Sequence, residues 1–238
     1  MPESFTRVLE TLARSDGPDV DFASPFVEVL PVNGASVATL GDFLGTETLS
    51  ATDKRAARID ELQFDLGEGP CWDAMLAAAP VFEPDLRQHP TRVWPAFSEA
   101  IQSEEIGAIF AFPMVVGPLK LGAIDLYCTA PFVLSAADSQ RSKLLAAVVS
   151  RLVLRRAFTA LEHPEPPEPS GPFFRRTLHQ ATGMVLAQLN IAAEDARLVI
   201  QAHAFSTGRS VQEVAEDVLA RKVDFTISNA TAEGQNDD

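Results

Sequence analysis

The residues that could carry acid–base, nucleophilic or metal chemistry are scattered along this sequence of 238 residues. The histidines show none of the spacings that a zinc site needs; they are His89, His163, His179 and His203. No Gly-x-Ser-x-Gly run, P-loop or Gly-x-Gly-x-x-Gly run is present. Cys71 and Cys128 form neither a Cys-x-x-Cys motif nor a disulfide framework, which is typical of a reducing compartment. This pattern argues against an enzyme.

A second group of residues is consistent with a small-molecule pocket. The segment 66–71 (Leu-Gly-Glu-Gly-Pro-Cys) must form a loop, but it lacks the Lys-Ser/Thr pair of a phosphate-binding loop. The aromatic side chains around it either form the core of a sheet, which the spacing favours, or line an apolar cavity closed by the loop. No motif identifies a cofactor or ligand. The candidate lining residues are Cys71, Trp72, Phe82, Trp94, Phe110, Phe112 and Asp125.

The charges are distributed unevenly. The net charge of −14 argues against generic attraction to nucleic acid or anionic lipid. Residues 1–170 have 13 Lys and Arg against 24 Asp and Glu, whereas residues 171–225 have 6 against 6. Only this neutral block could present a local basic face. Composition alone favours a solvated helix face for its cations, which are Arg175, Arg176, Arg197, Arg209, Arg221 and Lys222.

The elements that must position these residues divide at a proline-rich segment. Residues 162–172 contain five prolines in eleven residues, so we expect an extended linker there. Before it, residues 1–161 contain apolar residues at both helical and strand spacings. They predict an α+β domain, a mainly antiparallel sheet with flanking helices. Asn33-Gly34 predicts a hairpin between strands at 26–31 and 35–40. Further strands are expected at 43–50, 80–83, 108–116 and 121–127, and a long helix at 135–161.

After the linker, residues 173–226 predict an all-helical bundle. Apolar stripes indicate helices at 173–189, 193–206 and 210–222. Gly208 should end the second helix, and Ser210 with Glu213 forms a capping-box pattern at the start of the third. The polar residues 227–238 are expected to be a disordered tail.

Residues 178–225 resemble an ANTAR domain, the three-helix RNA-binding module of bacterial antitermination regulators. The resemblance covers roughly 50 residues and runs in register through all three helices. Many family members carry Lys where this sequence has Thr182, which removes a positive charge from the face expected to meet phosphate. The matching residues are Gln180, Ala181, Gly183, Met184, Val185, Ala193, Ala196, Ile200, Arg209, Val214, Ala215, Val218, Ala220 and Arg221.

The first domain resembles a GAF domain of the kind that is fused to ANTAR in actinobacterial-type regulators. The resemblance rests on residues 61–71, 94–97, 110–113 and 121–127. GAF domains bind small ligands in a pocket beneath the sheet or act as dimerisation modules. The sequence shows no evident cyclic-nucleotide signature and no assignable cysteine for a covalent bilin.

Together, these resemblances imply a cytoplasmic sensor-regulator. The GAF domain would take an unidentified signal, the helix at 135–161 would pair with its copy in a homodimer, and the ANTAR bundle would bind paired RNA hairpins and favour readthrough of a terminator. The N-terminal segment is acidic and polar, unlike a signal peptide, and no apolar run is long enough to cross a membrane. The expected RNA contacts are Arg175, Arg176, His179, Thr182, Arg209, Arg221 and Lys222.

Three alternatives remain open at this point. The first is a protein–protein regulatory module with GAF-mediated dimerisation and no RNA target, which the acidic total and Thr182 favour. The second is a GAF-type thiol reductase, which would need Cys71 and Cys128 close in space. The third is a DNA-binding helix-turn-helix, and the acidic polar face of the third helix argues against it.

Overall fold

The chain divides into two compact units, Met1–Phe174 and Arg175–Asp238. The computed structural model describes residues 3–17, 20–41, 44–88, 93–162 and 176–226. The expected linker at 162–172, apart from its first residue, and the expected tail at 227–238 lie outside these residues, as do His89, His163 and Arg175. None of the helices in the described ranges combines the length and the hydropathy of a membrane span.

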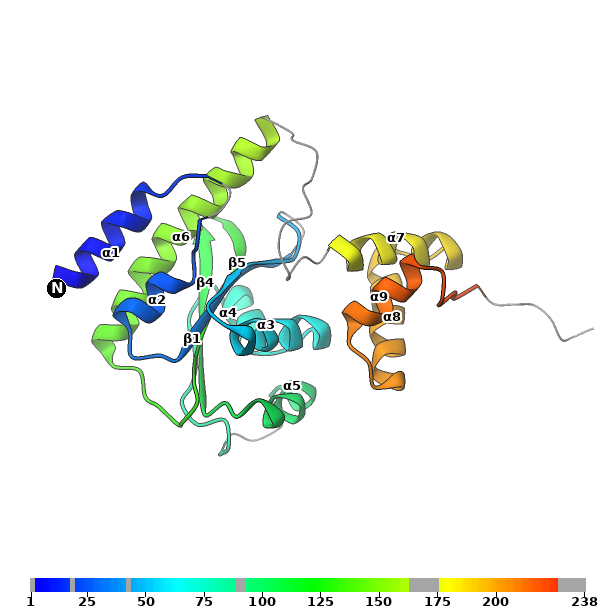
Figure 1. The fold of residues 1–238 in the computed structure, drawn as a ribbon, viewed down its shortest axis with the longest axis horizontal. Coiled ribbons are helices and arrows are strands. Elements are labelled where there is room, and N and C mark those ends of the chain that lie inside the picture. Colours follow the sequence, from blue (N-terminus) through cyan, green and yellow to red (C-terminus); the bar gives the residue numbers. More distant parts are fainter. Residues whose placement is uncertain (1–2, 18–19, 42–43, 89–92, 163–175, 227–238) are drawn as a thin grey trace, which may run out of the picture. The chain divides into compact units, whose positions relative to one another are not determined.

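The N-terminal unit is built on one antiparallel sheet in the order β2-β1-β5-β4-β3, as Figure 1 shows in part. A tight turn at Gly117 joins the two longest strands, which the sequence predicts at 108–116 and 121–127. The α+β prediction is therefore confirmed. The strands are β1 (Gly34–Thr39), β2 (Glu47–Ala51), β3 (Val81–Glu83), β4 (Ala108–Val116) and β5 (Leu119–Cys128).

The hairpin expected around Asn33-Gly34 is wrong. The segment before it forms a helix, α2 (Ser24–Val29), because Pro25 occupies the first helical turn and Asp21 accepts hydrogen bonds from the amides of residues 23 and 24. The side chain of Asn33 accepts instead from the amide of Thr129 at 2.9 Å, and β1 pairs with β5. A short apolar run fits either a helix or a strand, so the local pattern was ambiguous.

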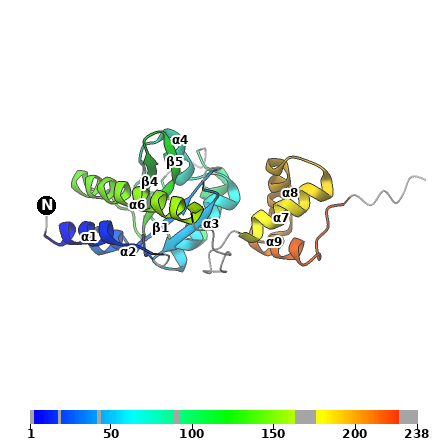
Figure 2. The ribbon, with the colours of Figure 1, turned by 90° about the horizontal axis from the view of Figure 1, so that it is seen from above.

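Helices cover both faces of the sheet (Figures 1 and 2). One face packs on α1 (Glu3–Arg14), α2 and the long α6 (Ala136–Glu162), and their apolar side chains form the larger core. The other face packs on α3 (Lys54–Leu66), α4 (Pro70–Ala77) and α5 (Pro95–Ala100), which the short 3-10 helix η1 (Ile101–Glu104) follows. The helix predicted at 135–161 is thus present, one residue later at each end.

Two adjacent strands approach each other closely at Gly122. Its φ is +156°, and a Cβ atom there would lie 2.0 Å from the carbonyl oxygen of Ala38 on β1. Only glycine fits this approach, because the obstacle is backbone that cannot rotate away. Gly122 therefore fixes the β1–β5 pairing at the centre of the sheet.

The C-terminal unit is a bundle of three helices, α7 (Arg176–Leu189), α8 (Ala193–Thr207) and α9 (Val211–Leu219). The predicted caps are present: Gly208 is left-handed at the end of α8, and Ser210 with Glu213 forms the capping box of α9. The third helix ends at Leu219, three residues before the predicted end. The core side chains of the bundle are Leu178, Ala181, Val185, Ala196, Ile200, Ala204, Val211, Val214, Ala215 and Val218.

Candidate functional site

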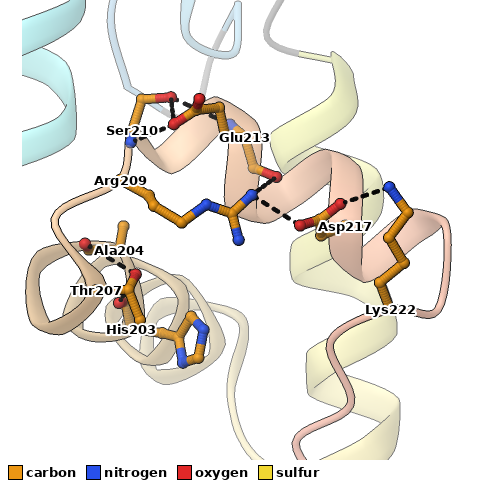
Figure 3. Close-up of polar contacts among 8 residues, drawn as sticks. All are labelled: His203, Ala204, Thr207, Arg209, Ser210, Glu213, Asp217 and Lys222. Carbon is orange, nitrogen blue, oxygen red and sulfur yellow. Dashed lines mark hydrogen bonds and ion pairs between the residues drawn. The ribbon is translucent and has the colours of Figure 1, made fainter.

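The turn between α8 and α9 is held rigidly (Figure 3). The amide of Arg209 donates to the carbonyl of Ala204 at 3.0 Å, and the hydroxyl of Thr207 donates to the carbonyl of His203 at 2.7 Å. On the far side of the turn, the amide of Ser210 donates to the carboxylate of Glu213 at 2.9 Å. These bonds satisfy backbone groups that helix ends otherwise leave unpaired, so the turn presents its side chains in fixed positions.

Arg209 extends from this turn along α9. Its guanidinium donates to Oδ2 of Asp217 at 2.7 Å and to the carbonyl of Glu213 at 3.2 Å. Lys222 approaches the same carboxylate from the other side and donates to Oδ1 at 3.1 Å. Hydrogen bonds from Arg209 and then Lys222 lower the pKa of Asp217. One carboxylate therefore lies between two cations.

Arg209 precedes α9 and Lys222 follows it, and both side chains meet at Asp217 near the end of the helix. The side chain of Lys222 is 71% exposed and that of Arg209 is 35% exposed. Arg221, also exposed, follows the helix in a left-handed conformation with φ +56°. Three carboxylates interact with these three cations, because Glu213 and Asp217 lie near Arg209 and Asp224 lies near Arg221. What the group offers to a phosphate is therefore exposed guanidinium and ammonium donors rather than a net positive charge. We call Arg209, Arg221 and Lys222 the basic corner.

Of the other expected RNA contacts, only the side chain of Thr182 is described, and it lies on α7. The hydroxyl of Thr182 is half-buried on α7 and donates to the carbonyl of Leu178 at 2.7 Å, so its proton is used within the helix. Arg175 lies outside the described residues, and so do the side chains of Arg176 and His179.

Sequence reasoning missed the role of Asp217 and treated Arg209 as unpaired. Their spacing of eight residues carries no helical signal, because Arg209 precedes α9 and reaches Asp217 only after the turn has formed. Arg209 is therefore a residue that ties the turn to α9 as well as a cation of the basic corner.

The seven candidate pocket residues lie on two opposite faces of the sheet. Phe110 and Phe112 pack with the side chains of α6, and Phe82 lies beside them with ring centroids at 5.9 and 5.7 Å. The remaining four lie on the opposite face of the sheet, against α3, α4 and α5. Alternation along β4 and β5 separates the two groups, since neighbouring residues of a strand point to opposite faces.

Three of the four residues on the α3 and α4 face, Cys71, Trp72 and Asp125, contact Gln63, which sequence reasoning did not identify. The side-chain amide of Gln63 donates to Oδ2 of Asp125, and its oxygen accepts from the amide of Cys71 at 2.8 Å. Its backbone carbonyl accepts from the indole of Trp72 at 2.7 Å. Trp94 donates to Asp73 at 3.0 Å on the same face. Gln63 thus joins α3, α4 and β5.

Asp125 is buried beside a second buried acid, Asp60, which accepts a hydrogen bond from the hydroxyl of Thr48. Burial, and then repulsion from Asp60, raise the pKa of Asp125 to about 8. Within the described part of the chain, Oδ1 of Asp125 has no hydrogen-bond partner. The raised pKa favours the protonated form of Asp125, and its Oδ1 is a buried polar atom on this face of the sheet.

The two cysteines lie on opposite faces of the sheet. Cys128 lies in the core on the α6 face, whereas Cys71 lies on the α3 and α4 face, so the fold separates the pair that a reductase would need. Among the residues that the structure describes, no three His, Cys, Asp or Glu side chains are grouped as metal ligands.

Comparison with known proteins gives a family-model match for the C-terminal unit and a fold likeness for the N-terminal unit. The family model of the ANTAR domain matches residues 174–219. The GAF domain of the Acinetobacter phosphoenolpyruvate-protein phosphotransferase superposes with a TM-score of 0.51 at 11% identity, covering 66% of this chain and 93% of that one. The corresponding GAF domain from Coxiella burnetii gives a TM-score of 0.49 at 14% identity, covering 66% and 97%. No curated protein matches the sequence significantly.

The two results cover different parts of the chain and agree with the elements described above. The five-stranded sheet and its helices account for the GAF likeness, and α7, α8 and α9 fall within or beside the matched ANTAR residues. The chain combines an N-terminal unit of the GAF fold with a C-terminal ANTAR domain.

Proposed function

We propose that this chain is a cytoplasmic, signal-responsive regulator whose ANTAR domain binds RNA hairpins in nascent transcripts and favours readthrough of a terminator. Its role is regulatory rather than catalytic. The observation that carries the proposal is the basic corner of Arg209, Arg221 and Lys222 on the ANTAR domain of a protein with a net charge of −14. A local basic surface on an acidic protein favours a specific anionic partner over general adhesion to polyanions.

The chemistry of the basic corner suits a hairpin loop. Lys and Arg contact phosphates and position the protein on the nucleic acid, while unpaired bases in the loop supply the sequence information. A bundle of three short helices is small enough to meet one loop. Specific binding therefore depends on both the loop sequence and the salt concentration.

A homodimer would let two ANTAR domains meet two hairpins of one transcript. The long helix α6 supports such pairing, because Leu144, Val148 and Leu154 are only partly buried and Phe158 is 51% exposed near its C-terminal end. Linking two binding modules raises the effective concentration of the second without new contacts. The same helix packs on the sheet, so a change in the GAF unit can alter the pairing.

The signal would be a small molecule that binds on the α3 and α4 face. Asp125 supplies a buried polar atom without a partner, and Gln63 connects it to the start of α4. A ligand that replaces the Gln63–Asp125 hydrogen bond would therefore shift α4 relative to the sheet.

The test is a binding titration of the full chain with a two-hairpin leader RNA, a loop-scrambled control and a duplex DNA, at two salt concentrations. We expect RNA binding that depends on the loop and weakens with salt. Residues 171–228 are titrated in parallel, because binding by this fragment alone would mean that the full chain masks its ANTAR domain at rest. Absence of loop-dependent binding by both proteins would overturn the proposal and leave a protein partner as the alternative.

A further inference from the structure

One aromatic side chain of the ANTAR domain lies almost entirely in solvent. Phe205, in the last turn of α8, is 81% exposed, although its neighbour Ala204 is buried in the core of the bundle. Leu198 is 58% exposed on the same side of α8, and the exposed Ala202 lies between them. Spacings of four and three residues place these three side chains on one stripe of the helix.

The backbone beneath Phe205 is fixed, whereas its ring is uncovered. The carbonyl of Phe205 accepts from the amide of Gly208 at 3.2 Å, within the left-handed cap that ends α8. An aromatic side chain on a helix leans toward the N-terminus and lies over the residues three and four positions before it. One of these is Ala202, whose methyl group is too small to cover the ring. Phe205 therefore offers a flat apolar face from a rigid position.

Cations lie at the same end of α8. Arg209 follows Phe205 by four residues, across the cap, and its guanidinium is held against α9 next to Lys222. Near the opposite end, where the helix begins at Ala193, it carries both Asp195 and Arg197. Arg209 and Lys222 thus supply cationic donors for an anionic chain near the end of α8 that carries Phe205.

The area of the apolar stripe formed by Leu198, Ala202 and Phe205 can be compared with the area that each kind of partner buries. A stable protein interface buries about 800 Å² on each partner, whereas one aromatic side chain buries roughly 150–250 Å². Phe205 and Leu198 together supply only part of that area. A single nucleobase needs only the face of one ring.

We infer that Phe205 is a base-stacking residue, which holds one unpaired nucleobase of an RNA loop while the basic corner meets the adjoining phosphates. This inference rests on the proposed RNA-binding function and adds the residue that contacts the base. Stacking of a base on an aromatic side chain contributes roughly 5- to 150-fold to affinity. It involves no charge, so it leaves the salt dependence to the cations.

The experiment compares variants of the full chain for binding to the two-hairpin leader RNA. Phe205→Ala and Phe205→Leu should weaken loop-dependent binding by at least about 5-fold, whereas Phe205→Tyr should keep it, because tyrosine retains the aromatic face. Leu198→Ala is the matched control on the same stripe and should bind as the original chain does. The slope of affinity against salt should be equal in all four variants, and thermal unfolding should be unchanged, since Phe205 is exposed.

An RNA with an abasic nucleotide in the loop supplies a second measurement. At the stacked position the missing base should weaken binding of the original chain but not of Phe205→Ala, because the two changes remove the same contact. If the original chain binds the loop and Phe205→Ala binds it equally well, stacking is overturned while RNA binding stands. Binding restored by Phe205→Leu would indicate apolar docking and also overturn it. If the original chain shows no loop dependence, the proposed function fails and the stacking role fails with it.

Discussion

Arg209 donates a 2.7 Å hydrogen bond to Asp217 across the turn that joins α8 to α9. The same carboxylate also accepts from Lys222 at 3.1 Å (Figure 3). The ANTAR domain thus neutralises part of its own basic corner, and a phosphate that approaches Arg209 must compete with Asp217. Arg221 is exposed after the end of α9, where it interacts with Asp224 through charge, whereas Arg209 donates directly to its carboxylate.

The first prediction is that Arg221→Ala reduces the salt dependence of RNA binding more than Arg209→Ala does. Each phosphate contact to a single strand contributes about 0.7 to the slope of log affinity against log salt concentration. Arg221→Ala should lower the slope by up to that amount, whereas Arg209 already has a carboxylate partner and should change it less. Titrations at several salt concentrations measure the slopes.

Asp217→Asn is the control for this comparison. It removes the competing charge, so the slope should become steeper as Arg209 and Lys222 become available to phosphate. Equal slopes for Arg209→Ala and Arg221→Ala, with no effect of Asp217→Asn, would contradict the internal pairing as a determinant of RNA binding.

The second prediction concerns pH and the GAF unit. The pKa of Asp125 is about 8 in the folded chain, against an ordinary value of 3.8, so the folded state holds one proton more than the unfolded state between these values. The free energy of unfolding should therefore fall as pH rises from about 4 to 8, by at most about 1.4 kcal/mol per pH unit. Asp125→Asn keeps an acceptor for Gln63 and lacks this proton, so its stability should depend less on pH.

Urea unfolding between pH 5 and 9 measures this difference. The two tryptophans of the chain, Trp72 and Trp94, both lie in the GAF unit, so their fluorescence reports on that unit alone. The variant should become the more stable protein as pH rises. Parallel pH profiles for the two proteins would rule out Asp125 as the titrating group.

The third prediction compares two glycines. Gly122→Ala places a Cβ atom 2.0 Å from the carbonyl oxygen of Ala38 and should lower the free energy of unfolding of the GAF unit by about 3 kcal/mol or more. Gly117→Ala, in the β4–β5 turn, meets nothing within 4 Å and should cost only about 1 kcal/mol for its left-handed backbone. Urea unfolding followed by tryptophan fluorescence measures both. Similar losses for the two variants would argue against the close approach of β1 and β5.

The fourth prediction concerns residues that follow the matched ANTAR segment. The ring of Phe225 contacts that of His203 edge-on at 5.3 Å, and the amide of Phe225 donates to the side chain of Gln188 at 3.2 Å. The chain after α9 therefore packs back on α7 and α8. Phe225→Ala should destabilise the bundle by about 1 kcal/mol, because it removes this ring contact and part of the apolar cover.

Hydrogen exchange of α7 and α8 in the full chain measures this effect, since local opening exposes their amides. Phe205→Ala is the control, because the exposed Phe205 contributes no cover to the core. Unchanged protection in Phe225→Ala would show that the bundle does not depend on the segment after Leu219.

The elements whose signals are local could be read from the sequence. The helices of the ANTAR domain follow from apolar residues at helical spacing, and Gly208 and Ser210 mark their ends because capping involves residues only three or four positions apart. The β4–β5 hairpin follows for the same reason, from two strands and the turn at Gly117. The resemblance to ANTAR rests on these local patterns and agrees with the family match at 174–219.

The partners of individual side chains could not be read in this way. Gln63 is an ordinary polar residue of a helix until α3 packs on the sheet and brings it to Asp125, 62 residues further along the chain. Phe110 and Asp125 seemed to share a pocket, yet the strand register places them on opposite faces. Arg209 seemed available to RNA until the turn brought it to Asp217.

The sequence by itself thus determined the two-part architecture, the caps at Gly208 and Ser210 and the candidate cations, because these depend on short-range periodicity and backbone preferences. Only the tertiary structure decided which acids are buried, which cations are already paired and which aromatic ring is left uncovered. Those properties arise when distant segments pack together and remove some groups from water while leaving others in it, and no local pattern encodes that distinction.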